Sequence, residues 1–131
     1  MKLRYIKKEI WRYRNIEKKF MFEVHKWNES EVVHWNKYLY LFPGNSDFGK
    51  YLPDADRVFP ETPFDWNYGI TYYDEIYDKE GKMVYQQFGD DYDHIWDERD
   101  HSPLGEDGVR VFEDAEKFIK TLEEMYGNSN G

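Results

Sequence analysis

The sequence predicts an α+β domain in which an antiparallel sheet carries a C-terminal α-helix packed on one face. Aromatic residues make up 20% of the 131 residues, and aromatic side chains fit the half-buried surface of a sheet better than they fit a helix. In the second half, two alternating apolar runs flank a short polar turn, which is typical of a β-hairpin. The last part of the chain carries apolar residues at helical spacing instead. A helix with one apolar stripe must bury it, so we expect the helix to cover the sheet.

The N-terminal segment is expected to enter the sheet. Residues 2–15 alternate only loosely and predict either an edge strand or a short helix. Residues 18–27 alternate regularly, with Phe20, Phe22 and Val24 on one face. This period of two is the pattern of a half-buried strand.

Residues 36–44 predict a further strand. Leu39 and Leu41 lie on one side of it, aromatic residues occupy the other side, and Pro43 ends it. A strand that is apolar on both sides is central in its sheet or covered by another element. The next segment, 45–65, contains three prolines and shows no periodicity. A structureless stretch of this length is usually functional or mobile, so we expect it to act as a lid.

The clearest local pattern is a hairpin. Residues 70–77 and 82–88 are two alternating aromatic and β-branched runs, and the four residues between them end in Gly81. This arrangement predicts antiparallel pairing of the two runs. Gly69, just before the first run, predicts a bulge or a close backbone approach.

The C-terminal helix is predicted from an apolar stripe with spacings of three and four. Glu113 and Asp114 are expected in its first turn, where the helix dipole favours anions, and Gly127 is expected to stop it. We therefore expect one domain over 1–127 and a disordered tail over 128–131. The stripe consists of Val111, Phe112, Ala115, Phe118, Ile119, Leu122 and Met125.

Composition excludes several classes of site. The chain has no Cys, which removes disulfides, thiolate nucleophiles and Cys-based metal centres. The first ten residues are basic and mixed rather than an apolar signal sequence, so a cytoplasmic location is expected. The longest apolar run covers only residues 38–42, far below the roughly 20 residues that span a bilayer. No cofactor is predicted.

Charge is distributed unevenly along the sequence. Residues 1–42 carry 10 Lys or Arg against 5 Glu, a net charge of +5, whereas residues 43–131 carry a net charge of −14. Acidic surface disfavours nucleic acid and anionic membranes as direct partners of the C-terminal two thirds. The expected partner is a protein with a basic surface, although the charge also fits a simple role in solubility.

Residues 88–101 hold six carboxylates and two imidazoles. Asp91, His94 and Asp97 are spaced by three, so a helical or turn-like backbone would bring them together as metal ligands or a general base pair. The segment does not follow the calcium-loop pattern, because Ile95 occupies the third ligand position. In the alternative interpretation His94 bonds to Asp91 or to a backbone carbonyl, and the other acids face water.

Two short stretches resemble a family of small phage and prophage proteins of unassigned function. Members of that family carry a His-Gly-Gly-Ile-Thr-Tyr stretch, then a Gly-Phe-Asp-x-x-His-x-x-Asp stretch, then a C-terminal helix. Asn67 and Tyr68 replace the first His and Gly of this pattern here. The resemblance implies an accessory protein of a mobile element, of a kind that often inhibits host systems, and hence the host cytoplasm as its location. The matching positions are Gly69, Ile70, Thr71 and Tyr72, followed by Gly89, Asp91, His94 and Asp97.

The favoured hypothesis is a non-enzymatic inhibitor of a host defence or nucleic-acid-processing protein. It would use an acidic, aromatic surface that partly imitates the charge density of DNA. Its expected partner is a host protein with a basic surface, with no direct contact to nucleic acid or membrane. The predicted binding residues are Asp90, Asp91, Asp93, His94, Asp97, Glu98 and Asp100.

Two alternatives stay open. The protein could sequester a nucleotide, with Tyr and Trp stacking the base, with Arg12, Arg14 or Lys18 contacting phosphate, and with the segment 45–65 closing over it. It could instead be a metal-assisted hydrolase that uses Asp91, His94 and Asp97. His25 and His34 are expected to be ordinary sheet histidines, and exposed strand edges make a homodimer possible.

Overall fold

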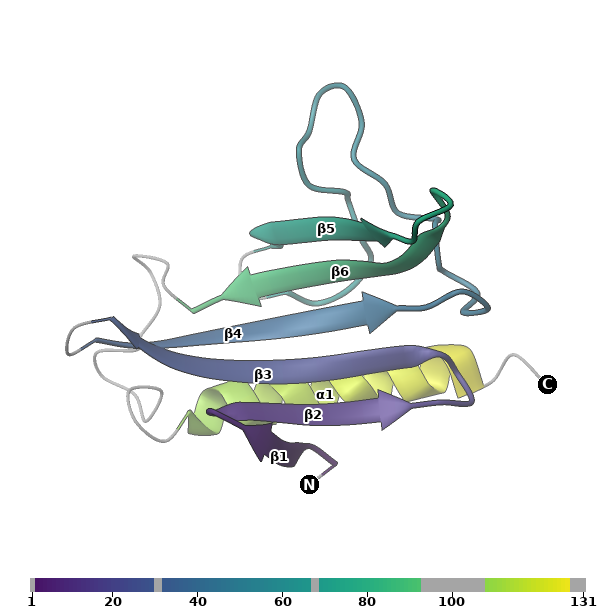
Figure 1. Cartoon of the computed structure of the whole chain (residues 1–131). Coiled ribbons are helices and arrows are strands. Elements are labelled where there is room, and N and C mark those ends of the chain that lie inside the picture. Colours follow the sequence, from purple (N-terminus) through teal and green to yellow (C-terminus); the bar gives the residue numbers. More distant parts are fainter. Residues whose placement is uncertain (1, 30–31, 67–68, 93–107, 128–131) are drawn as a thin grey trace.

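The computed structural model describes residues 2–29, 32–66, 69–92 and 108–127. Its strands form one antiparallel sheet in the order β1-β2-β3-β4-β6-β5, and the helix α1 packs against β3 and β4 (Figure 1). The predicted α+β architecture is therefore confirmed. The elements are β1 (Arg4–Lys7), β2 (Ile10–Asn15), β3 (Phe20–Glu29), β4 (Val32–Leu41), β5 (Tyr72–Tyr77), β6 (Met83–Asp91) and α1 (Val109–Gly127).

The N-terminal segment forms two strands joined by a tight turn. Lys7 pairs with Ile10, so Lys8 and Glu9 alone make the loop. Both have positive φ, 43° and 63°, as the two central residues of a type I′ hairpin turn require. The alternative of a short helix over residues 2–15 is wrong, because the chain turns back on itself within this segment.

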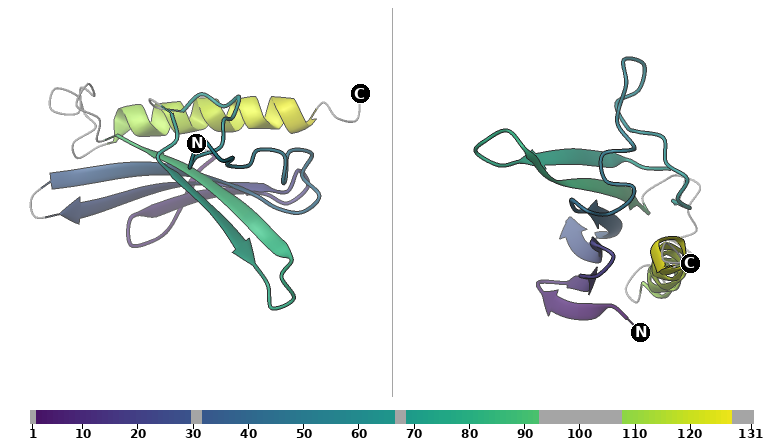
Figure 2. Two further views of the ribbon diagram at one scale, coloured as in Figure 1. Left: turned by 90° about the horizontal axis from the view of Figure 1, so that it is seen from above. Right: turned by 90° about the vertical axis from the view of Figure 1, so that its right-hand side faces the viewer.

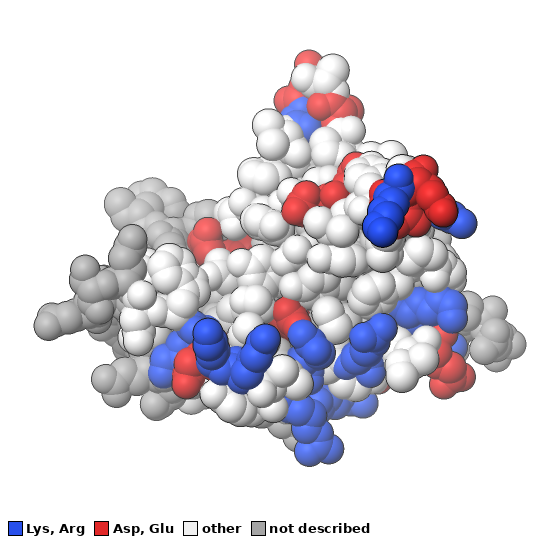
Figure 3. Space-filling view, viewed as in Figure 1, with Lys and Arg blue, Asp and Glu red and all other residues white. Residues whose placement is uncertain are grey.

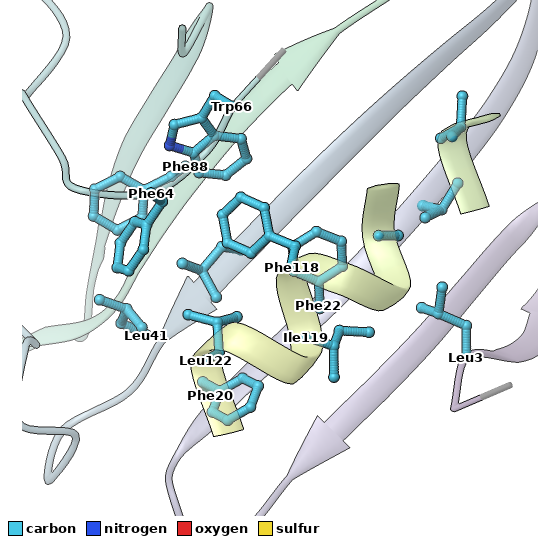
Figure 4. Close-up of a cluster of buried hydrophobic side chains, with 14 of the residues drawn as sticks. Leu3, Phe20, Phe22, Leu41, Phe64, Trp66, Phe88, Phe118, Ile119 and Leu122 are labelled. Carbon is cyan, nitrogen blue, oxygen red and sulfur yellow. The ribbon is translucent and has the colours of Figure 1, made fainter. Parts of the chain in front are cut away.

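The core lies between the sheet and α1. Phe20, Phe22 and Val24 of β3 pair with residues of β4 whose side chains point to the same side, including Leu39 and Leu41. These five side chains are fully buried. Figure 4 shows several of them beneath α1.

The helix begins earlier than the sequence predicted. It starts at Val109, so Glu113 and Asp114 lie beyond the first turn, which holds no acidic residue. Its buried stripe ends in Tyr126 rather than in Met125, which is 42% exposed. Gly127 is the last helical residue, as expected.

The predicted hairpin is confirmed, with β5 beginning at Tyr72 and β6 extending to Asp91. Gly69 precedes β5 with φ +88°, and a Cβ built on it would meet no described atom within 4 Å. Its positive φ is the left-handed conformation that glycine adopts without strain, and among the described residues no close approach occurs at this position. The close approach lies instead at Gly89, where an added Cβ would lie 2.6 Å from Cδ1 of Tyr38.

The segment between β4 and β5 is partly built into the core. Phe64 and Trp66 are buried, and the buried carboxylate of Asp47 accepts a hydrogen bond of 3.0 Å from the Tyr126 hydroxyl. These parts pack on the same side of the sheet as α1 (Figure 2). Residues 54–59 form a continuous exposed tip, and the lid role predicted for residues 45–65 stays a prediction.

Among the described residues, no helix combines the length and the apolar character needed to cross a bilayer. The predicted tail, 128–131, lies outside the described residues.

Candidate functional site

The acidic stretch divides at the end of β6. Asp90 is only 1% exposed and forms a buried ion pair with Lys37, with 3.5 Å between Oδ2 and Nζ. Asp91 is half-buried opposite Asn36 and points to the other face of the sheet. Asp90 therefore does not contribute to an exposed acidic surface. The other predicted residues, Asp93, His94, Asp97, Glu98 and Asp100, lie outside the described residues.

A metal site formed by Asp91, His94 and Asp97 stays a prediction, because only Asp91 of the three is described. Within the described parts of the chain, no group of three or more His, Asp or Glu residues is placed to hold a metal ion.

The chemistry that the structure does bring together lies on the sheet face opposite α1, which we call the open face. Arg12 and Arg14 share this face, since they are two residues apart on β2, about 6.7 Å along a strand. Arg4 of β1 pairs with Arg12 and shares its face. Figure 3 shows Lys and Arg gathered over β1 to β3, a central area with few charged side chains, and acidic side chains toward the β5–β6 end. Arg4, Arg12 and Arg14 are hereafter the arginine stripe.

Glu23 joins the arginine stripe to the centre of the open face. It lies opposite Arg12 in the sheet register and is only 3% exposed. Its Oε2 accepts a hydrogen bond of 2.7 Å from Nε of Arg12, and its Oε1 accepts hydrogen bonds of 2.8 Å from Nε2 of His25 and from the Tyr40 hydroxyl. Gln87 donates in turn to the Tyr40 hydroxyl at 3.1 Å. A buried carboxylate thus holds donors from three strands in fixed positions.

Burial and hydrogen bonding act in opposite directions on this carboxyl. Burial alone would raise the pKa of Glu23, but the hydrogen bonds from His25, Arg12 and Tyr40 outweigh it and leave the pKa below its ordinary value of 4.5. Glu23 is therefore ionised at neutral pH, and His25 Nε2 must be the donor because a carboxylate only accepts. Burial and the Glu23 carboxylate raise the pKa of Tyr40, which keeps its hydroxyl a donor.

Aromatic rings occupy the centre of the open face. Trp27 stacks on His34 with centroids 4.2 Å apart and donates from Nε1 to Asn36 Oδ1 at 2.7 Å. Tyr38 makes edge contacts with Tyr72 at 5.6 Å and with His25 at 4.6 Å. The predicted sheet histidines are thus part of this face. Trp27, Tyr38, Tyr72 and Tyr85 are hereafter the aromatic patch, in which Trp27 is 44% and Tyr72 is 39% exposed.

The open face contains two of the three cations predicted to contact phosphate. Arg12 and Arg14 belong to the arginine stripe, whereas Lys18 lies in the turn between β2 and β3. The segment predicted to close over the ligand packs mainly on the other side of the sheet, so the ligand would not be enclosed as expected. Sequence reasoning missed Glu23. A lone carboxylate inside an apolar strand, two residues from a histidine, is the signal that could have found it.

No family model, curated protein or solved structure matches the chain. The resemblance to phage and prophage proteins therefore stays a prediction, and two of its residues, His94 and Asp97, lie outside the described residues. Function is inferred from the chemistry of the open face.

Proposed function

We propose that the open face binds a ligand built from nucleotides, with bases on the aromatic patch and phosphates on the arginine stripe. One observation supports this proposal: three arginines and four aromatic side chains share one sheet face. Among the described residues, no second layer of strands or helices covers that face (Figures 1 and 2). Cations that contact the backbone beside rings that stack bases are the usual means of binding single-stranded nucleic acid.

The spacing of the two groups suits this ligand. Arg12 on β2 and Tyr38 on β4 lie two strands apart, about 10 Å, which is comparable to the reach from phosphate to base in one nucleotide. Tyr72 lies two strands farther across the sheet, on β5. A short strand running from β1 toward β5 could therefore place successive bases on successive rings.

Two of the three arginines have side chains placed by neighbouring groups. Nε and Nη2 of Arg12 both lie 2.7 Å from Glu23 Oε2, and a guanidinium has five N–H donors, so donors remain for a phosphate. The Arg14 guanidinium lies 5.2 Å from the centroid of the Phe42 ring, and Arg4 is exposed. Preorganised side chains lose less entropy when the ligand binds.

This proposal differs from the prediction that nucleic acid is not a direct partner. That prediction was based on the acidic residues 43–131, whereas the arginine stripe belongs entirely to the basic N-terminal third. The acidic-surface inhibitor hypothesis stays a prediction, since five of its seven residues lie outside the described part of the chain. A local cluster of cations can bind phosphate although the whole protein carries a net charge of −9.

The proposal is tested by isothermal titration calorimetry with mononucleotides and with short single-stranded oligonucleotides. Tyr72→Ala should weaken binding by about fivefold or more, since stacking on an aromatic side chain contributes about 1–3 kcal/mol per base. Arg14→Ala should weaken it by a similar factor, since a hydrogen bond to a charged group contributes about 1.5–3 kcal/mol. Tyr77→Ala and Arg57→Ala are the matched controls. Tyr77 lies on the same strand as Tyr72 but bonds to Glu75 on the other face, and Arg57 lies in the exposed loop tip.

A free nucleotide and a single-stranded nucleic acid, the two possible ligands, predict different relative affinities. Equal affinity for a mononucleotide and an oligonucleotide would indicate a nucleotide-sequestering protein, whereas tighter binding of the oligonucleotide would indicate a single-strand binder. Absence of binding by either, or equal losses in the control variants, would reject the proposal.

A further inference from the structure

A separate pocket lies on the α1 side of the sheet. It has a volume of about 220 Å³ and lies between residues 63–66 and α1. Phe64, Trp66 and Phe118 form apolar walls, and Figure 4 shows these three rings grouped beside the helix. The volume lies below the roughly 300–1,000 Å³ of pockets that hold drug-sized ligands, so the pocket suits a smaller molecule.

Lys37 lines this pocket and is an unusual residue to find there. It lies in the centre of β4 and is only 1% exposed. Its Nζ lies 5.3 Å from the centroid of the Tyr92 ring and 5.6 Å from that of Phe118. Burying an ammonium is costly unless it is well paired. An apolar side chain would pack at this position without that cost.

The pairing of Lys37 with Asp90 is loose. Their 3.5 Å separation is longer than the roughly 2.7–2.9 Å of a charge-assisted hydrogen bond. An ammonium carries three N–H donors, so Nζ can donate to an acceptor that enters the pocket while it keeps its ion pair. A carboxylate is the acceptor that such a donor binds most strongly.

The other charged side chains of the pocket carry both signs. Lys117 and Asp65 are exposed at its rim, and Asp114 is half-buried within it. Oδ2 of Asp114 accepts a hydrogen bond of 2.6 Å from the Tyr92 hydroxyl, and a carboxylate has further acceptor positions. An anionic ligand would be attracted by the two lysines but repelled by the two aspartates, and a cationic one would meet the reverse. A ligand with one charge of each sign can place each charge beside side chains of the opposite sign.

We propose that this pocket binds a small zwitterion of the α-amino-acid class. Its carboxylate would bond to Lys37, its ammonium would lie beside Asp65 or Asp114, and its apolar side chain would contact Phe64 and Trp66. This site is independent of the open face, because it lies on the other side of the sheet. The two proposals can therefore fail separately.

The experiment is a titration of the full chain with the natural amino acids, followed by two analogues of the tightest binder. The amide analogue removes the carboxylate charge, and the deaminated acid removes the ammonium. Each analogue should bind at least tenfold more weakly than the amino acid. Failure of every amino acid to bind, or equal affinity for either analogue, would overturn the proposal.

Variants locate the site. Lys37→Met should abolish the preference for the acid over its amide. Because this variant leaves Asp90 buried without its lysine and could fail to fold, Asp65→Asn and Lys117→Met at the exposed rim serve as a second test, each expected to weaken binding about threefold to tenfold. Lys120→Met, on the exposed side of α1, is the control and should bind as the wild type does. Unchanged affinity in both rim variants would place the ligand elsewhere and reject this pocket.

Discussion

At the scale of single residues, Glu23 affects both the stability of the sheet and the geometry of the proposed site. A carboxylate in the middle of an apolar strand is stable there only because Arg12, His25 and Tyr40 all donate to it. The same bonds fix the position of Arg12 on the open face. One residue thus contributes both to stability and to the geometry of the proposed site.

Replacing Glu23 by Gln should reduce the free energy of unfolding at neutral pH by about 1.5–3 kcal/mol, the range for hydrogen bonds to a charged group. The pKa of Glu23 is lower in the folded protein than its ordinary value of 4.5. Its stabilisation is therefore present above that value and is lost as the pH falls through the folded pKa. The difference between wild type and Glu23→Gln, measured by urea denaturation from about pH 7 to about pH 3, should shrink with acidification.

Glu80→Gln, in the exposed turn of the β5–β6 hairpin, controls for the loss of one negative charge. It should change the unfolding free energy by less than about 0.5 kcal/mol at neutral pH. A Glu23→Gln deficit that stays constant down to the lowest pH would contradict the assigned role of the carboxylate.

Gly89 is the second residue on which the packing of the open face depends, because its lack of a side chain lets the Tyr38 ring lie against the backbone of β6. Gly89→Ala would place a Cβ 2.6 Å from the Tyr38 ring and 3.2 Å from the Lys37 carbonyl oxygen. It should destabilise the protein by about 1–3 kcal/mol through overpacking. In a double-mutant cycle with Tyr38→Ala, the cost of Gly89→Ala should fall by more than about 0.5 kcal/mol. Equal costs in both backgrounds would show that the Tyr38 ring is not the obstacle.

At the scale of secondary-structure elements, the sequence predicted what depends on local pattern and missed what depends on contacts distant in sequence. The alternation in 18–27, 36–44 and 70–88 predicted four of the strands correctly. The turn at Lys8 and Glu9 escaped prediction because neither residue is a usual occupant of positive φ. The start of α1 was placed two residues late. Gly108 precedes it with φ +64°, in contact with Trp35, and no local pattern predicts that contact.

The end of the helical stripe gives a direct test of the corrected packing. The predicted stripe included Met125, whereas the structure buries Tyr126, which is 4% exposed. Tyr126→Ala should cost about 3–5 kcal/mol of unfolding free energy, as expected for a buried aromatic side chain. Met125→Ala should cost less than about 1 kcal/mol. Chemical denaturation of both variants decides between the two stripes, and the reverse order of costs would support the predicted one.

At the scale of the whole molecule, charge summed along the sequence overstates the acidic surface that is open to a partner. The sum over 43–131 is strongly negative, but part of it is internal, because Asp90 is paired with Lys37 in the core and Asp47 with Tyr126. Arg12 and Arg14, which the sequence suggested as phosphate contacts, lie on the open face, and phosphate binding by them stays a prediction. That they share a face with the aromatic patch depends on strand register, which composition cannot reveal.

The charge distribution limits how long a bound strand can be. The open face is roughly 24 Å wide from β1 to β5, enough for about four nucleotides at the density of small single-strand sites. Beyond it, further phosphates would meet a protein with a net charge of −9. If the open face binds single strands, the affinity for oligothymidylates of about two to about twelve nucleotides should rise with length and then level off. This affinity is the value per binding position, obtained after correcting for the larger number of positions that a longer strand offers.

The dependence of oligonucleotide affinity on salt concentration is a second test of the arginine stripe. If about three arginines replace counterions on a single strand, the slope of log K against log salt should be about −2. It should be smaller in magnitude for Arg14→Ala, because one cation is lost, and unchanged for Arg57→Ala. An affinity that keeps rising with each added phosphate, with a slope that steepens in parallel, would mean that cations outside the arginine stripe bind the strand. The open face would then not determine the length of strand that the protein binds.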